Sequence, residues 1–73
     1  MFAEDPPAAE LTDRQREILS AVVRGLTNPE IGTALGISPN SVKWHLKEIF
    51  ARIGAANRSE AVAIALRKHL LKI

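Results

Sequence analysis

Apolar side chains recur at helical spacing in four successive stretches of this 73-residue chain, and no stretch shows the sustained alternation of a strand. Residues suited to capping a helix precede the first three stretches, namely Thr12, Thr27 or Asn28, and Ser38, and the fourth stretch begins near residues 57–59. Gly25 and Gly36 follow the first two stretches, where glycine readily adopts the left-handed conformation that ends a helix. The pattern therefore predicts an all-α domain of four helices.

The first two predicted helices each direct one apolar stripe toward a common core. Gln15 lies three residues after Thr12, which is the spacing of a capping box at the start of the first helix. Gly32 stands inside the second helix, where glycine costs about 1 kcal/mol relative to alanine, so we expect another helix to cross closely there. The two stripes comprise Leu11, Ile18, Leu19, Val22 and Leu26 in the first helix and Ile31 and Leu35 in the second.

The third predicted helix begins at Pro39, ends at about Ile53 and has two chemically different faces. With a rotation of about 100° per residue, one face gathers the apolar side chains of Val42, Leu46, Ile49 and Ile53. The opposite face, flanked by Lys43, gathers Asn40, Trp44, Lys47 and Ala51. One face is therefore expected to join the core, and the other offers amide, aromatic and cationic groups to a partner.

The fourth predicted helix runs to about His69 and is apolar on two sides. We expect its core side to comprise Val62, Ala65, Leu66 and Leu70, and its other side to comprise Ala61, Ile64 and Leu71. Apolar residues on both sides of a helix indicate a second buried contact. The alternative is a surface that carries a few small apolar residues without a partner.

The second and third predicted helices are joined by the short turn Gly36–Ser38, an arrangement typical of the helix-turn-helix motif. In that motif the second helix enters the major groove of DNA and the first crosses the phosphate backbone. The first ten residues hold three acidic side chains and no basic one, and the rest of the chain is basic, which agrees with a polyanionic partner. Many small helical bundles share such a hairpin, and a solvated basic surface would give the same charge pattern.

Four segments of the chain resemble, in order and spacing, the LuxR-type (GerE-type) helix-turn-helix domain of bacterial transcription regulators. They are LTDRQREIL at 11–19, GLTNPEIGTALGIS at 25–38, SVKWHLKEIFARIG at 41–54 and NRSEAVAIA at 57–65. The resemblance implies a domain that binds double-stranded DNA in a sequence-specific manner, with its recognition helix at about 39–53 in the major groove. It also implies a homodimer that pairs through its last helix.

The resemblance also implies roles for individual residues. Base contacts are expected from Asn40, Lys43, Trp44 and Lys47, and phosphate contacts from Thr27, Asn28, Ser41, His45 and Arg58. Bracing of the helix is the alternative role for His45. The implied dimer interface lies around Ala61, Ile64 and Lys68. The chain departs from the family pattern at three positions: Pro29 replaces a frequent lysine, Gly32 replaces the usual alanine, and Trp44 is larger than the usual residue.

Composition and residue spacing argue against other functions. Without cysteine the chain cannot form a disulfide or a thiolate metal site, and His45 and His69 alone do not make a metal set. Ser41 and His45 lack an orienting acid, so no catalytic site is expected. We therefore expect a protein that is not an enzyme and binds no cofactor, metal or small molecule. The alternative function is a helical interaction module, such as a sigma-factor-like part that contacts RNA polymerase, and polymerase is also a candidate second partner of a regulator.

We divide the chain into a flexible acidic tail or linker at 1–10 and the DNA-binding domain at 11–73. Pro6 and Pro7 oppose helix formation in the tail. No apolar run approaches the roughly 18 residues of a membrane span, and the first residues lack the basic and apolar segments of a secretory signal. We expect a cytoplasmic, nucleoid-associated bacterial protein without a membrane partner.

Overall fold

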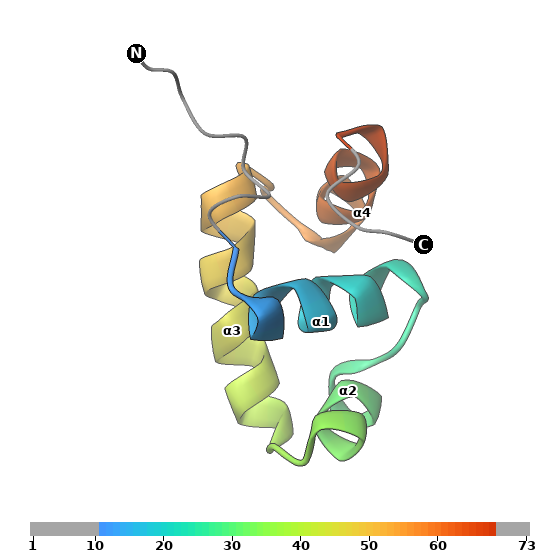
Figure 1. The fold of residues 1–73 in the computed structure, drawn as a ribbon, viewed down its shortest axis with the longest axis vertical. Helices are drawn as coiled ribbons and strands as arrows, with labels where there is room; N and C mark the ends of the chain where they lie inside the picture. Colours follow the sequence, from blue (N-terminus) through green and yellow to red (C-terminus); the bar gives the residue numbers. More distant parts are fainter. Residues whose placement is uncertain (1–10, 69–73) are drawn as a thin grey trace.

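The computed structural model of the chain describes residues 11–68, which form four helices (Figure 1). The helices are α1 (Asp13–Val23), α2 (Asn28–Leu35), α3 (Pro39–Ile53) and α4 (Arg58–Arg67). No strand occurs among these residues, so the predicted all-α fold is confirmed, as are the predicted bounds of the third helix. None of the helices in residues 11–68 is long and apolar enough to cross a membrane. The tail expected at 1–10 and the end of the fourth helix at His69 lie outside the described residues.

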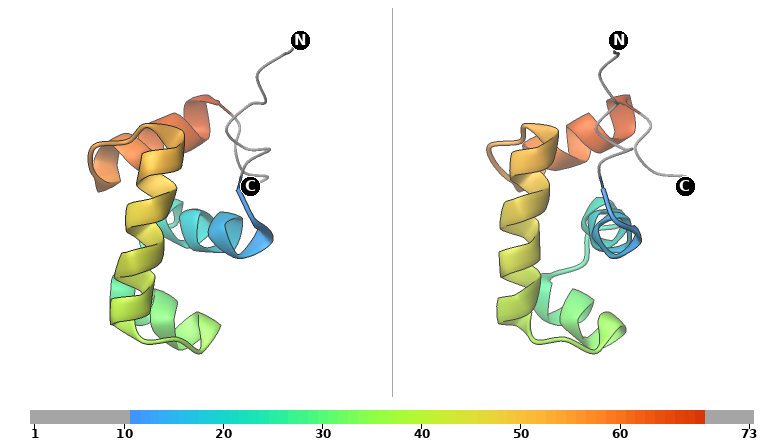
Figure 2. Two further views of the ribbon diagram at one scale, coloured as in Figure 1. Left: turned by 90° about the vertical axis from the view of Figure 1, so that its left-hand side faces the viewer. Right: turned by 60° about the vertical axis from the view of Figure 1, so that its left-hand side comes forward.

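Helix α3 is the element around which the other three helices are arranged. Helix α1 crosses α3 near its middle, α2 lies by the amino-terminal end of α3, and α4 lies by its carboxyl-terminal end (Figures 1 and 2). The buried side chains of α3 are Val42, Leu46, Ile49 and Ile53, as the helical pattern predicts. The opposite side of α3 is covered by no other helix, because every residue predicted to lie there is exposed.

Polar side chains fix where each helix begins. At α1 the backbone N–H of Gln15 donates to Thr12 Oγ1 (3.0 Å) and the N–H of Thr12 donates to Gln15 Oε1 (2.9 Å), which confirms the predicted capping box. Thr27 rather than Asn28 caps α2, and Glu30 completes a second capping box there. The remaining caps are Ser38 for α3 and Asn57 for α4. The amino-terminal ends therefore follow from local sequence alone.

The core collects the buried faces of all four helices. Its largest side chains with almost no exposed surface are Ile18, Leu19, Ile31, Val42 and Ile49. Leu26 and Leu35, which belong to the predicted stripes, are only half-buried and pack against the edge of this cluster. Gln15 is the one polar side chain buried among residues 11–68, and the capping box satisfies it.

Helix α4 is rotated relative to the expectation drawn from its pattern. Ala61 and Ile64, expected on the side away from the core, are 0% and 6% exposed, whereas Leu66, expected in the core, is 50% exposed. The assignment was wrong for these three residues, although Ala65 is buried as expected. Residues 61–66 are all apolar, so periodicity does not fix which side faces inward. Packing on α1 and α3 selects the side that carries Ala61, Ile64 and Ala65. Leu70 and Leu71 lie outside the described residues.

The close contact expected at Gly32 exists but comes from a different neighbour. A Cβ atom built on Gly32 would lie 2.5 Å from the carbonyl oxygen of Ile37 and 3.4 Å from the backbone of Ser38 and Pro39. The expectation of a crossing helix was therefore wrong: the turn between α2 and α3 folds back onto α2. The N–H of Ile37 donates to the carbonyl of Gly32 (2.9 Å), which holds the turn in that position.

Candidate nucleic-acid interface

The four residues predicted to contact bases share the uncovered face of α3. Asn40, Lys43, Trp44 and Lys47 are all exposed, and Trp44 as a whole residue is 59% exposed. Burial of Trp44 in the core is excluded, since Val42 and Leu46 occupy the core side of the same turns. The predicted division of α3 into a core face and an outward face is thus confirmed.

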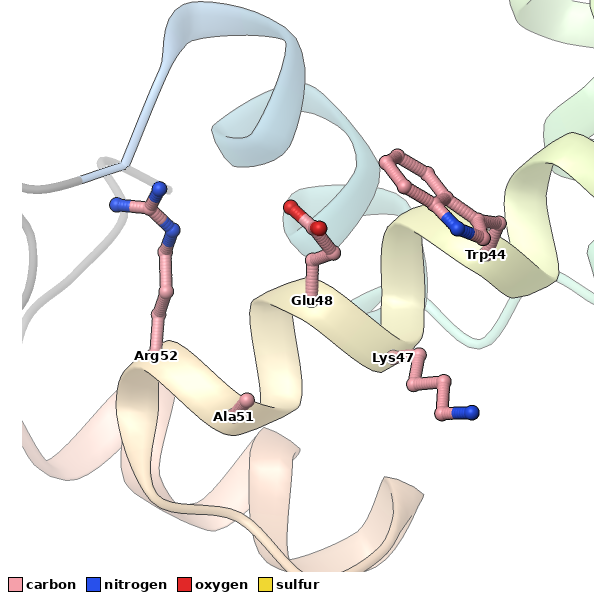
Figure 3. Close-up of a pocket in the computed structure, with 5 residues that line it drawn as sticks. All are labelled: Trp44, Lys47, Glu48, Ala51 and Arg52. Carbon is pink, nitrogen blue, oxygen red and sulfur yellow. The ribbon is translucent and has the colours of Figure 1, made fainter.

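A shallow open hollow of about 510 Å³ lies along this face of α3 (Figure 3). It is lined by Trp44, Lys47, Glu48, Ala51 and Arg52, and these side chains all come from one helix. In Figure 3 Lys47 extends to one side of the helix, and Glu48 and Arg52 extend to the other side. The small side chain of Ala51 leaves room between them. The aromatic surface of Trp44, the donor group of Lys47 and the acceptor group of Glu48 therefore occur together. Groups of these kinds distinguish base edges in the major groove.

His45 contacts the ring of Trp44. The two ring centroids are 5.5 Å apart and the ring planes meet at 75°, which is the edge-to-face arrangement that aromatic pairs favour. His45 is half-buried, and its contact with Trp44 agrees with the bracing role that was the alternative to a phosphate contact. Sequence reasoning missed this contact because adjacent helical residues point in different directions.

Hydroxyl groups lie at the first turns of α2 and α3, where phosphate contacts are predicted. Thr27 Oγ1 accepts from the N–H of Glu30 (3.2 Å), and Ser41 Oγ accepts from the hydroxyl of Ser38 (3.1 Å). Both Thr27 and Ser41 are exposed, and each acts as an acceptor in these bonds, so its own O–H can still donate to a phosphate oxygen. Helix amino termini also favour anions through their backbone N–H groups and dipole.

Arg58 makes contacts that the sequence did not reveal. Its Nη1 donates to Asn28 Oδ1 (3.0 Å) and its Nη2 donates to the carbonyl oxygen of Leu26 (2.6 Å). Arg58 and Asn28 are both half-buried. The guanidinium expected on a phosphate is therefore bound to the start of α2. No helical spacing relates residues so far apart in the chain, so only the tertiary structure brings them together.

The two lysines of the uncovered face, Lys43 and Lys47, are not paired with acidic side chains in residues 11–68. Two ion pairs, Arg14–Glu17 at 3.7 Å and Arg16–Asp13 at 2.9 Å, lie on α1 and are exposed. Exposed pairs of this kind contribute little to stability. Among residues 11–68, no three carboxylate or imidazole side chains gather in the way that metal ligands do.

Comparison with known proteins identifies the family. The sequence pattern described as bacterial regulatory proteins, luxR family, matches residues 9–65, which is most of the chain. The chain belongs to the LuxR family. The match confirms the resemblance drawn from the four sequence segments of the chain. The helix-turn-helix of this LuxR-family chain is formed by α2 and α3.

Relatives within the LuxR family are transcription regulators by name. The probable transcriptional regulatory protein SgaR of Hyphomicrobium methylovorum is 47% identical over 58 residues, which covers 80% of this chain and 28% of SgaR. The probable transcriptional regulatory protein NarL of Mycobacterium tuberculosis (strain CDC 1551 / Oshkosh) is 36% identical over 66 residues, covering 90% and 31%. The transcriptional regulatory protein YdfI of Bacillus subtilis (strain 168) is 39% identical over 64 residues, covering 88% and 30%. The chain thus spans less than a third of each of these relatives.

Proposed function

We propose that this chain is the DNA-binding domain of a bacterial transcription regulator and inserts α3 into the major groove of double-stranded DNA. The observation that carries the proposal is the face of α3 that no other helix covers. It presents exposed cationic, amide and aromatic side chains, and the three other helices pack against the opposite face of α3. Membership of the LuxR family supports the same function. The domain acts by binding rather than by catalysis, in the bacterial cytoplasm.

Direct contacts to bases come from the uncovered face of α3. Lys43 and Lys47 are donors without acceptors, so their best partners in the major groove are the paired acceptors O6 and N7 of guanine. The indole of Trp44, held edge-on by His45, packs on a thymine methyl group beside the hollow. Asn40, one turn earlier, offers an amide that can pair with adenine.

Contacts to phosphates come from the first turns of α2 and α3. The hydroxyls of Thr27 and Ser41 and the amide of Asn28 are neutral donors that fix the register of the domain on the duplex. The exposed lysines of α3 and the positive ends of the helices attract the polyanion. Most of the affinity is therefore expected to be electrostatic, and most of the sequence preference to come from α3.

Binding to a fluorescein-labelled duplex of mixed sequence should be strongly salt-dependent. We expect anisotropy to show at least about tenfold weaker binding at about 200 mM than at about 50 mM salt, because neutralised phosphates release counterions. The emission of Trp44, the only tryptophan of the chain, should shift or be quenched when the duplex is added. The variant Trp44→Phe controls for signal from the DNA. Absence of binding at both salt concentrations would contradict the proposal and favour the alternative interaction module.

A second copy of the chain is proposed to pair through the exposed side of α4. Since Ala61 and Ile64 are buried within one copy, the pairing surface is assigned to the side with Ser59, Ala63 and Leu66. Leu66 and Trp44 are the large apolar residues that remain exposed among residues 11–68. Lys68, also expected at the interface, is exposed at the end of α4 but lies one turn after Ile64, on the buried side of the helix. A two-fold dimer would place two half-sites about 10 bp apart.

Leu66→Glu should abolish cooperative binding to paired half-sites. A carboxylate at the centre of the interface would face its own copy across the two-fold axis, and like charges there are unfavourable. Cooperativity is measured as the steepness of binding to a duplex carrying two copies of a site selected from a random library. Thr33→Glu, an exposed change on α2, is the control for added negative charge. Retained cooperativity in a Leu66→Glu variant with normal circular dichroism would refute this surface.

A further inference from the structure

Arg58 holds the beginnings of α4 and α2 together. Its two hydrogen bonds, to Asn28 Oδ1 and to the carbonyl of Leu26, cross from the first residue of α4 to the first residue of α2 and the loop before it. Helix α2 packs mainly on α3, whereas α4 packs on α1 and α3. The guanidinium therefore supplies a link between two helices that do not pack extensively on each other.

The same hydrogen bond fixes the orientation of the Asn28 amide. A guanidinium only donates hydrogen bonds, so the atom of Asn28 that faces Arg58 must be the acceptor Oδ1. The donor Nδ2 of the amide is consequently turned away from Arg58. Asn28 stands next to the Thr27 cap in the first turn of α2, where backbone N–H groups and the helix dipole favour an anion.

We propose that Arg58 is a positioning residue for DNA binding. Arg58 makes no contact with DNA itself. It binds Oδ1 of Asn28 and thereby directs the Nδ2 donor of Asn28 toward a phosphate oxygen. This inference rests on the proposed DNA-binding function and replaces the direct phosphate contact expected for Arg58 from the sequence. Arginine suits the role because its rigid fork serves two acceptors at once, which the single ammonium of lysine cannot do in the same geometry.

The substitution Arg58→Lys separates positioning from direct contact, because it keeps the charge and removes the fork. We expect the melting temperature of the free protein to fall by about 5–10 °C from the loss of one or both hydrogen bonds. At a temperature where circular dichroism shows the variant folded, binding to the labelled mixed-sequence duplex should weaken about tenfold. The slope of log affinity against log salt should stay unchanged. Arg67→Lys, an exposed arginine on the same helix, should change neither quantity.

The variant Asn28→Ala completes a double-mutant cycle. If Arg58 acts through Asn28, then Asn28→Ala should weaken DNA binding about as much as Arg58→Lys, and the double variant should bind no worse than Asn28→Ala. Normal DNA binding by a folded Arg58→Lys variant, or additive losses in the double variant, would overturn the positioning role. A wild-type chain that binds no duplex would instead refute the proposed function, and the change in melting temperature would still report the link between α2 and α4.

Discussion

Gly32→Val should destabilise the domain by about 2–3 kcal/mol or more, which is a large part of the roughly 5 kcal/mol expected for so small a domain. The Cβ position at Gly32 lies 2.5 Å from the backbone carbonyl oxygen of Ile37, far inside ordinary contact distance. Backbone in a tight turn cannot move aside as the end of a flexible side chain can. A branched side chain must therefore push α2 away from the turn that leads into α3.

Thermal unfolding followed by circular dichroism measures this effect, and we expect the melting temperature to fall by more than about 10 °C. Ala34→Val is the matched control, because it adds a branched side chain to an exposed position of the same helix. It should cost only a few tenths of a kcal/mol, from the helix propensity of valine. Equal stability of the two valine variants would show that the turn yields freely and that Gly32 does not set its position.

Lys47→Ala should lower affinity for the best DNA site by about 1–3 kcal/mol, or roughly tenfold to more than a hundredfold. The ammonium of Lys47 stands beside the hollow on the uncovered face of α3 and forms no ion pair within residues 11–68. Removing it would leave the guanine acceptors O6 and N7 without a donor. On DNA of mixed sequence the loss should be much smaller, because a base contact contributes little there.

The experiment compares a duplex selected from a random library with one of mixed sequence, at equal salt concentration. Arg67→Ala, which removes an exposed positive charge from α4, controls for the change in net charge and should affect both duplexes equally. Equal losses on both duplexes for Lys47→Ala would mean that Lys47 contacts phosphate, and that the base assignment for this residue is wrong.

The sequence by itself determined the features that depend only on residues a few positions apart in the chain. Each helix follows a capping residue whose side chain accepts a hydrogen bond from the backbone N–H three residues later. Thr12 and Ser38 could therefore be recognised without any tertiary structure. The two faces of α3 were equally predictable, because Val42 and Leu46 repeat at helical spacing and polar residues fill the opposite side. The candidate base-contacting residues followed from that phase and from the family resemblance.

Only the tertiary structure decided which side of α4 is buried, what lies against Gly32, and where Arg58 binds. In α4 residues 61–66 are all apolar, so packing against α1 and α3, rather than the pattern, selected Ala61 and Ile64 for the core. At Gly32 the neighbour is the backbone of a turn, whose path depends on how α2 meets α3. The Arg58–Asn28 hydrogen bond joins residues from distant parts of the chain, and no periodicity relates them. Contacts of this kind depend on how the helices meet in space, which local sequence rules do not encode.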